Sequence, residues 1–410
     1  MIAAFPSLNG LRPNPNWAKL PLFDRKGWKR IPFGTFADSI NERVEPSDAA
    51  EEIYVGLEHL DPQSLHIRRW GKGSDVIGTK LRFRKGDIIF GRRRAYQRKL
   101  AIAEFDGICS AHAMVVRAKP ELVLPEFLPF LMTSDKFMNR AVEISVGSLS
   151  PTINWTTLKL EEFDLPPLDQ QHRIAEILWA VDGCKVQKKS LYDWLKVSRK
   201  AKLNIACSSN SEIMRLGDVV VYASDGPFGS KLKTEHYVNS GMRVIRLQNI
   251  GDGHFEDADK AYISTDYFEE LRRYAVFAGD VIVAGLGDET HPVGRAALIP
   301  ETLGAAINKA DCFCIRADTR KVLNAYLVHF LNSAPGIEQL RARAQGTTRM
   351  RINVGNIKTV LVPVPSVEQQ KRMTEDLKRM EIELVQVQQS ILDTDSLLTS
   401  LIILVFEDGR

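Results

Sequence analysis

Cysteine is scarce in this sequence and follows no pattern. The chain has five Cys among 410 residues, and none has the paired CxxC spacing of a zinc site. The eight His residues are scattered without the spacing of metal ligands or of a catalytic triad. We therefore expect no disulfide framework and no metal site, and a reducing cytoplasm fits this cysteine usage best.

Motifs of catalysis are missing as well. The sequence contains no P-loop, no nucleophile elbow and no convincing pair of catalytic carboxylates. Gly285-Leu286-Gly287-Asp288 has two glycines of a dinucleotide fingerprint, but the third is absent and His291-Pro292 follows where a helix should begin. We expect no catalytic residue in this chain.

Long apolar runs are also lacking. The longest one, Leu401 to Phe406, is far below the ~18 residues that span a bilayer. No charged segment followed by an apolar one opens the sequence as a leader would. We therefore expect a cytosolic protein that has no membrane partner.

The formal net charge is only +4, and it is unevenly distributed. Residues 1–209 hold 32 Lys and Arg against 24 Asp and Glu, a net of +8, whereas residues 210–410 hold 23 against 27, a net of −4. A polyanion-binding surface over the whole chain is not supported, so any nucleic-acid footprint must be local.

An internal duplication is present instead. The length allows two or three domains, and a shift of 199 residues places Gln170-Gln171 on Gln369-Gln370. Farther upstream the shift drifts to 193, where Gly86-Asp87 falls on Gly279-Asp280. The constant shift marks a scaffold that has kept its length in both copies, and the changed shift marks an upstream region that has not. Such a difference is expected if the scaffold fixes the geometry of the protein and the upstream surface determines its specificity.

Both copies predict the same order of elements. Turn residues separate short β-rich runs at 81–90, 102–105, 242–247 and 275–283. A helical segment follows in each copy, at 125–140 and at 323–343, and then a glycine-containing loop, a proline-marked connection and a long helix. The fold class is therefore α+β, with two β-rich domains that each precede a long helix. The expected limits are an N-terminal extension at 1–27, domains at 28–165 and 212–364, and helices at 166–208 and 365–406.

The long helices have coiled-coil patterns. The second has apolar residues in alternating 4,3 spacing, whereas Lys188 interrupts the seam of the first. We expect the two helices to pair with each other as an antiparallel coiled coil; two separate dimerisation helices are the alternative. The predicted seam and partner-docking residues are Ile174, Ile177, Val181, Leu191, Leu195, Met373, Leu377, Met380, Leu384, Val387 and Ile391.

Basic residues are densest between Arg82 and Lys99. Guanidinium groups donate planar pairs of hydrogen bonds to phosphates and guanine edges, so this run is a candidate DNA contact; a solvated charged hairpin is the bland alternative. The candidate residues are Arg82, Arg84, Lys85, Arg92, Arg93, Arg94, Tyr96, Arg98 and Lys99.

The second copy has fewer candidate DNA contacts. The turn from Asp225 to Lys233 offers two lysines and free backbone N–H groups to a phosphate. The loops 145–153 and 345–352 take equivalent places in the repeat, although a purely structural role explains a turn of this kind nearly as well. The candidate contacts from these segments and from the strand end at Arg246 are Ser148, Lys231, Lys233, Arg246, Thr347, Arg349 and Arg351.

The repeated motifs resemble those of the specificity subunit of type I restriction-modification systems. The similar segments cover nearly the whole chain from about Trp28, and their combination is more specific than any one of them. They are Leu165-Pro166-Pro167-Leu168-Asp169-Gln170-Gln171-His172-Arg173-Ile174, Pro365-Ser366-Val367-Glu368-Gln369-Gln370-Lys371-Arg372-Met373, Gly226-Pro227-Phe228-Gly229-Ser230-Lys231-Leu232, Arg246-Leu247-Gln248-Asn249-Ile250 and Gly86-Asp87-Ile88-Ile89-Phe90-Gly91-Arg92-Arg93-Arg94.

The resemblance implies a non-catalytic subunit that reads double-stranded DNA. Each domain would recognise one half of a bipartite, asymmetric site, and the helices would dock adenine-methylating subunits. A restriction subunit that translocates DNA would complete the complex. This chain would bind no cofactor; S-adenosylmethionine, ATP and Mg²⁺ would belong to the partner subunits.

Other readings of the same residues remain open. The chain could be a specificity-like DNA-binding subunit of a different bacterial defence complex, or a scaffold whose repeated domains bind protein. An autonomous endonuclease or methyltransferase is the least favoured reading, because about 140 residues per variable domain leave little room for a catalytic fold without visible motifs.

The helix length predicts the spacing of the two half-sites. At 1.5 Å per residue, about 37 residues make a rod of roughly 55 Å, which corresponds to at most about 16 base pairs. Inserting one heptad-like segment before Ser190 should therefore lengthen the non-specific gap and leave both half-sites unchanged. Sequencing of methylated DNA measures the outcome, and altered half-sites with an unchanged gap would contradict it.

Overall fold

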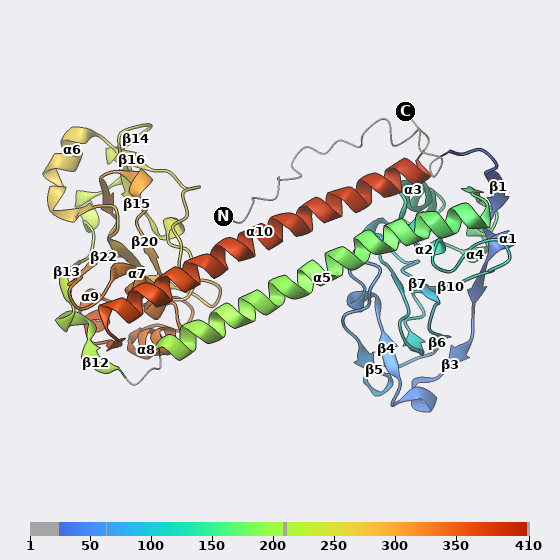
Figure 1. The fold of residues 1–410 in the computed structure, drawn as a ribbon, viewed down its shortest axis with the longest axis horizontal. Coiled ribbons are helices and arrows are strands. Elements are labelled where there is room, and N and C mark those ends of the chain that lie inside the picture. The colour runs from blue at the N-terminus through green and yellow to red at the C-terminus, as the bar shows by residue number, and fades with distance from the viewer. Residues whose placement is uncertain (1–23, 63, 208–210, 408–410) are drawn as a thin grey trace. The chain divides into compact units, whose positions relative to one another are not determined.

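The computed structural model describes residues 24–62, 64–207 and 211–407, and the chain folds into two compact units (Figure 1). Unit 1 comprises the described parts of Met1–Ser190 and Gln388–Arg410, and unit 2 comprises those of Leu191–Val387. Each unit thus contains one β-rich domain and a section of both long helices. Most of the predicted extension at 1–27 lies outside the described residues.

Both units contain the same four-stranded antiparallel sheet. The strand order is β2-β10-β7-β8 in unit 1 and β13-β22-β18-β20 in unit 2. The strands are β2 (Ala37–Ile40), β10 (Met114–Ala118), β7 (Ile88–Phe90) and β8 (Leu100–Ile102), and β13 (Val220–Ser224), β22 (Cys312–Ala317), β18 (Val281–Ala284) and β20 (Ala296–Leu298).

A five-stranded sheet lies in each unit as well, with one parallel pair in each: β4 with β9 and β15 with β21. The orders are β3-β6-β9-β4-β5 and β14-β16-β15-β21-β17, so four strands correspond and the fifth is added at opposite edges. The strands are β3 (Arg43–Val44), β6 (Lys80–Phe83), β9 (Gly107–Cys109), β4 (Ile53–Val55), β5 (Gly71–Lys72), β14 (Tyr237–Val238), β16 (Tyr262–Ile263), β15 (Met242–Ile245), β21 (Ala306–Asn308) and β17 (Ala275–Val276).

Two-stranded sheets and helices complete each unit. The pairs are β1 (Lys29–Pro32) with β11 (Glu162–Leu165), β12 (Glu212–Arg215) with β24 (Leu361–Val364), and β19 (Leu286–Gly287) with β23 (Met350–Arg351). The helices are α1 (Phe33–Phe36), α2 (Leu128–Thr133), α3 (Asp135–Glu143), α4 (Trp155–Leu158), α5 (Leu168–Cys207), α6 (Thr265–Glu270), α7 (Asn324–Leu331), α8 (Ala334–Arg343), α9 (Val354–Lys358) and α10 (Val367–Phe406).

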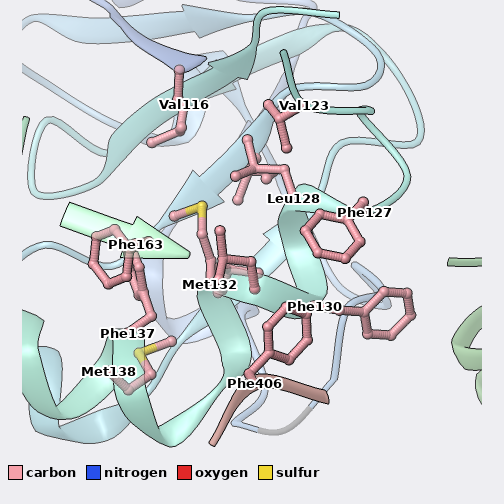
Figure 2. Close-up of a cluster of buried hydrophobic side chains, with 14 of the residues drawn as sticks. Val116, Val123, Phe127, Leu128, Phe130, Met132, Phe137, Met138, Phe163 and Phe406 are labelled. Atoms are coloured by element: carbon pink, nitrogen blue, oxygen red, sulfur yellow. The ribbon is translucent and has the colours of Figure 1, made fainter. Parts of the chain in front are cut away.

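The main core of unit 1 lies between its four-stranded sheet and its helices. Phe127, Phe130 and Phe137 are fully buried there together with strand residues such as Val116. Figure 2 shows Phe406, from the end of α10, among these side chains, and its ring centroid lies 5.4 Å from that of Phe127. The last turn of α10 is therefore part of this core.

Several predicted elements are shorter than expected. The segment 125–140 forms two helices, because Ser134 ends α2 and caps α3 by accepting a hydrogen bond from the Phe137 N–H. Ser333 divides the segment 323–343 in the same way. The run 81–90 forms β6 and β7, which belong to different sheets, and the strand predicted at 102–105 ends at Ile102. A serine at a helix start satisfies an unpaired backbone N–H, so a serine inside a predicted helical segment can begin a second helix.

The repeated Gly-Asp motif forms a buried ion pair in each unit. Asp87 is 2% exposed, and its two carboxylate oxygens accept hydrogen bonds from Arg117 at 2.6 and 2.8 Å. Asp280 pairs with Arg316 at 2.7 and 2.8 Å. A buried carboxylate needs such a partner because burial removes its hydration, so these two copies of one ion pair explain why the motif recurs.

The long helices α5 and α10 run antiparallel where they meet inside each unit. In unit 1, Lys185 Nζ lies 2.5 Å from Asp395 Oδ1, and in unit 2, Lys202 Nζ lies 2.5 Å from Asp376 Oδ2. The early part of α5 thus contacts the late part of α10, and the reverse holds in unit 2. Pairing of the two helices within the chain, as expected, is confirmed.

Lys188 occupies the seam of α5 without disrupting it. Its Nζ donates hydrogen bonds to Thr394 Oγ1 at 2.7 Å and to the Ser390 carbonyl at 3.3 Å. The long lysine stem packs along the neighbouring helix while its ammonium group finds oxygen acceptors. Lys188, the polar residue in the seam of α5, is thus paired with Thr394, the polar residue in the seam of α10.

Two predicted seam residues lie outside the helix contact. Ile177 is 38% exposed and Leu191 is 45% exposed, whereas Ile174 and Leu195 are buried and Val181 is half-buried. The placement of Ile177 and Leu191 on the seam is wrong, because lysines rather than apolar residues occupy part of it. On α10, Met373 and Leu377 are buried in the core of unit 2, and Met380, Leu384, Val387 and Ile391 are half-buried.

Among the described residues, α10 is the helix whose length and composition would also suit a membrane span, with a mean hydropathy of 1.4 over its most apolar 18 residues. Its Leu398, Leu401, Val405 and Phe406 are instead buried in the core of unit 1. Packing against the β-rich domain therefore accounts for part of this apolar composition, since 28% of that 18-residue window is buried.

A buried glutamine attaches the start of α5 to the domain of unit 1. Gln171 is 0% exposed, and its Oε1 accepts a hydrogen bond from the Leu124 N–H at 2.8 Å. Its Nε2 donates to the carbonyls of Leu122 and Pro166, both at 2.9 Å. Backbone groups thus use both N–H donors of the buried amide and one acceptor position of its oxygen.

Gln370 repeats this arrangement at the start of α10. Its Oε1 accepts from the Leu323 N–H, and its Nε2 donates to the carbonyls of Lys321 and Pro365, each at 2.8 Å. The second glutamine of the repeated Gln-Gln pair is therefore a structural residue in both copies.

Replacing Gln171 by Ala should destabilise unit 1 by about 2–4 kcal/mol, because one buried N–H and two carbonyls lose their partner and a cavity remains. Urea unfolding of the full chain measures the loss. The control His172→Ala, on the exposed face of the same helical turn, should change stability by less than ~0.5 kcal/mol. Equal effects of the two substitutions would contradict this assignment.

Candidate nucleic-acid interface

The basic run of unit 1 divides into parts with different roles. Arg82, on β6, lies 2.9 Å from Glu52 and 3.4 Å from Glu42, and Arg84 lies 3.9 Å from Glu42. Lys85 is exposed at the turn that follows. This first part of the run thus lies on the five-stranded sheet and the turn after it, and its arginines pair with carboxylates of the same domain.

The last part of the run is also engaged within unit 1. Arg98 pairs with Asp135 and donates a hydrogen bond to Asn139 Oδ1 at 3.0 Å. Lys99 Nζ donates to the Leu57 carbonyl at 2.6 Å. These groups hold the loop after β7 against the rest of the domain.

The middle part, Arg92 to Arg94, lies in a strained loop. Arg94 and Arg98 have φ angles of 58° and 51°, and they are the two non-glycine residues of the described chain with positive φ. They flank a short 3-10 helix at Ala95–Gln97, on which Tyr96 is 56% exposed. Left-handed φ is costly for a residue with a side chain and tends to mark functional loops.

The repeated loop 145–153 docks on this arginine segment. The Arg94 N–H donates to the Pro151 carbonyl at 2.7 Å, and the Ile153 N–H donates to the Arg92 carbonyl at 3.0 Å. Arg93 Nε donates to Ser150 Oγ at 2.7 Å. Two segments that are about 55 residues apart in the sequence therefore form one surface, with Ser148 exposed at the tip of the loop.

His112 joins the same surface from the turn between β9 and β10. Its Nε2 lies 3.1 Å from Arg93 Nη1. Burial, with the positive charges of Arg93, Arg92 and Lys80, lowers the pKa of His112, so the ring is neutral at pH 7 and can accept this hydrogen bond. His112 and Ser150 were absent from the sequence-based set, and only their place in the fold connects them with the arginines.

Unit 2 repeats the docked loop with different side chains. Gln345 and Arg351 exchange two backbone hydrogen bonds at 2.8 Å, as Val146 and Thr152 do in unit 1 at 3.0 and 2.9 Å. The Ile352 N–H donates to the Gly285 carbonyl at 3.0 Å, matching the bond from Ile153.

Each of these loops turns at a glycine with positive φ, Gly147 at 116° and Gly346 at 99°. A Cβ at position 346 would lie 2.5 Å from the Arg349 carbonyl, so glycine is needed at that turn. The repeated glycine therefore maintains the loop, and the side chains around it are free to differ.

Most candidate arginines of unit 2 are neutralised by their own domain. Arg351 lies 3.1 Å from Asp311, and Arg246 forms a two-pronged ion pair with Asp259. Arg349 and Thr347 are exposed at the loop tip. Arg349 is therefore the candidate guanidinium of this loop that has the freest access to an approaching phosphate.

The segment from Asp225 to Lys233 lies beside the turn that joins β21 and β22. A Cβ at Gly226 would come within 2.1 Å of the Asn308 carbonyl, so this close approach requires glycine. Lys231 is exposed, and Lys233 Nζ lies 3.5 Å from Glu235. Lys309, at that turn, is exposed as well.

We refer to these converging segments as the contact edge. Hydrogen bonds tie its parts together in both units; for instance, the N–H groups of Arg93 and Gly285 donate to the carbonyls of His112 and Asp311 at 3.3 and 2.8 Å. The contact edge comprises residues 57–60, 91–98, 110–112 and 145–153 in unit 1, and 225–233, 247–250, 285–295, 309–311 and 345–352 in unit 2.

Cys109 and Cys312, each next to a segment of the contact edge, are buried. Burial raises the pKa of Cys109 and of Cys312 to about 12, so neither thiol is a nucleophile at neutral pH. Within the described residues, no three His, Cys, Asp or Glu side chains are grouped closely enough to hold a metal ion. The exposed groups that remain are hydrogen-bond donors and acceptors, which suit recognition.

Comparison with known proteins agrees with this arrangement. The family described as "Type I restriction modification DNA specificity domain" matches residues 73–191 and 208–393. The chain is 31% identical over 156 residues to the type I restriction enzyme EcoDI specificity subunit of Escherichia coli, an alignment that covers 36% of this chain and 33% of that one. A match of greater extent is to the MjaVIII specificity subunit of Methanocaldococcus jannaschii, with 21% identity over 86% of each chain.

A solved structure has the same fold. The type I restriction-modification system S subunit from M. genitalium superposes with a TM-score of 0.56 and 13% identity, over 94% of this chain and 97% of that one. The duplicated arrangement of β-rich domains and long helices is therefore found in a protein of very different sequence.

Replacing Arg92, Arg93 and Arg94 together by Ala should weaken DNA binding about 10-fold or more and reduce the slope of log affinity against log salt by up to ~3, because about 0.9 counterion is released per phosphate contact. Titration of the full chain with duplex DNA at several salt concentrations measures both quantities.

The matched control replaces Lys29, Arg43 and Lys72 by Ala. These residues are exposed in unit 1 and lie outside the contact edge, so the charge change is the same and the salt slope should remain close to that of the unchanged chain. Equal losses in the two triple variants would contradict the contact edge and indicate a general charge effect.

Proposed function

The chain belongs to the family of type I restriction-modification DNA specificity proteins, and from this premise we propose that it is the subunit that reads DNA sequence for such a complex. The observation that carries the proposal is the duplication of the contact edge. Each half of the chain matches the family separately, and each has the same docked loop on the same four-stranded sheet.

Two contact edges of different chemistry imply a DNA site with two different halves. Unit 1 offers Arg92 to Arg94, Tyr96 and Ser148, whereas unit 2 offers Thr347, Arg349, Lys231 and Lys309. Arginine and lysine bind phosphates and hold the protein on the duplex, and polar side chains read base edges. The target is therefore double-stranded DNA with a bipartite and asymmetric sequence.

Catalysis belongs to partners in this proposal. The chain would dock adenine-methylating subunits through its long helices, and a restriction subunit that translocates DNA would join the complex. S-adenosylmethionine would be bound by the methylating subunits, and ATP and Mg²⁺ by the restriction subunit. We place the complex in the cytoplasm, where the chromosome that it reads is located.

Genome-wide mapping of methylated adenines tests the function directly. Cells that express the proposed complex with this chain should carry one methylated bipartite motif, and cells that have the methylating subunit alone should lack it. The motif reports the function and both half-sites in one measurement.

Co-purification distinguishes the remaining readings. The chain should co-purify with a DNA methyltransferase subunit, and the assembled complex should bind duplex DNA. A complex that includes the chain and binds no DNA would favour a protein-binding scaffold, and methyl transfer by the isolated chain would contradict the assignment of catalysis to the partners.

A further inference from the structure

One short turn has the same backbone in both contact edges but presents a different side chain. It follows the strand of the parallel pair in each unit: Leu57–His59 comes after β4, and Leu247–Asn249 comes after β15. In unit 1 the Gly56 N–H donates to His59 Nδ1 at 3.0 Å. In unit 2 the Arg246 N–H donates to Asn249 Oδ1 at 2.9 Å. The turn is thus closed by equivalent hydrogen bonds in the two copies.

A basic residue fixes this turn to the neighbouring loop in both units. Lys99 precedes β8 and donates to the Leu57 carbonyl at 2.6 Å. Arg295 precedes β20, and its Nη2 donates to the Leu247 carbonyl at 3.1 Å. The turn is therefore held rigidly against the arginine loop of unit 1 and against the corresponding loop of unit 2.

Additional bonds restrain the turn of unit 2 from its other side. Asn249 Nδ2 donates to the carbonyls of Glu256 and Asp259 at 2.8 and 2.7 Å, and Arg295 Nε donates to the Ile250 carbonyl at 2.8 Å. Asn249 and Arg295 are both buried. A side chain on such a turn has a defined starting position, which is what discrimination between bases requires.

The middle residue of the turn is the one whose side chain remains available. Leu57 and Leu247 pack against the cores of their units, and His59 and Asn249 close the turn. Glu58, between them in unit 1, has a side chain that is 66% exposed, and its nearest ionic partner, His59 Nε2, is 4.0 Å away.

Its counterpart in unit 2 is Gln248, which is exposed. Gln248 lines a surface cavity of about 600 Å³ together with Leu286 and Arg349. An uncharged amide in one unit and a carboxylate in the other thus occupy equivalent places, each next to a loop that we assign to DNA.

We propose that Glu58 and Gln248 are specificity-determining residues, each of which reads a base edge in the half-site of its own unit. A glutamine amide donates and accepts, which matches the N6 and N7 atoms of adenine, whereas a glutamate only accepts and matches the N4 amino group of cytosine. Unit 1 therefore requires a cytosine at the position that Glu58 faces, and unit 2 requires an adenine at the position that Gln248 faces.

This inference rests on the proposed function, and the substitutions Glu58→Gln and Gln248→Glu test it in the assembled complex. Each exchanges the hydrogen-bonding pattern while it keeps the size of the side chain. Glu58→Gln should change the preferred base at one position of one half-site, by about 10- to 100-fold in relative methylation, and Gln248→Glu should do so in the other half-site only. Mapping of methylated adenines across the genome measures both.

Two matched substitutions outside the contact edge control for charge. Glu51→Gln in unit 1 and Asn239→Asp in unit 2 change exposed residues in the same chemical sense, and both should leave the methylated motif unchanged at every position. Glu58→Ala removes the acceptor and should relax the same position that Glu58→Gln alters.

The possible failures are distinguishable. If the unchanged chain adds no methylated motif, the proposed function fails, and this inference fails with it. Suppose that the unchanged chain gives a methylated motif and that both test variants give the same bases at every position of it, whether the amount of methylation is unchanged or reduced. Only this inference is then overturned. A change in both half-sites caused by a single substitution also overturns it, because each residue belongs to one unit.

Discussion

The hydrogen bonds of one buried glutamine in each unit are the constraint on which the rest of the arrangement depends. Gln171 and Gln370 connect the first turn of a long helix with two backbone segments of the adjoining β-rich domain. Breaking such a connection would leave several buried backbone groups without partners. The direction of each helix is therefore coupled to the domain that precedes it, and thereby to the contact edge of the same unit.

The negative charge of the second half of the sequence does not make unit 2 acidic. Residues 191–209, with a net charge of +3, belong to unit 2, and residues 388–410, with a net charge of −3, belong to unit 1, so each unit has a formal net charge of +2. In unit 2, Asp311, Asp259 and Asp257 pair with Arg351, Arg246 and Arg243, so carboxylates of the same domain neutralise these arginines. A surface of this kind attracts phosphates less than that of unit 1 and relies more on hydrogen bonds to bases. The two units would then contribute unequally, with more of the electrostatic affinity from unit 1 and mainly selectivity from unit 2.

Helix pairing illustrates how far the sequence alone could be interpreted. The 4,3 spacing of α10 coincides with buried and half-buried residues, because apolar side chains at that spacing line one face. The same reasoning misplaced Ile177 and Leu191 on α5, since Lys185 and Lys188 take seam positions by pairing with Asp395 and Thr394. Whether a residue is apolar can be read from the sequence alone. A half-buried lysine, in contrast, is stable in the seam only because an oxygen acceptor on the other helix pairs with it, and the sequence does not show which residue that is.

The sequence by itself determined the duplication, the order of elements, the two long helices and the α+β class, because these follow from residue spacing and from short-range backbone preferences. Only the tertiary structure decided which basic residues remain available to DNA. Arg82 is neutralised by Glu42 and Glu52, whereas Arg92 to Arg94 meet a loop about 55 residues away. Ion pairing and docking depend on distances in space, and residues far apart in the sequence acquire those distances only when the chain folds.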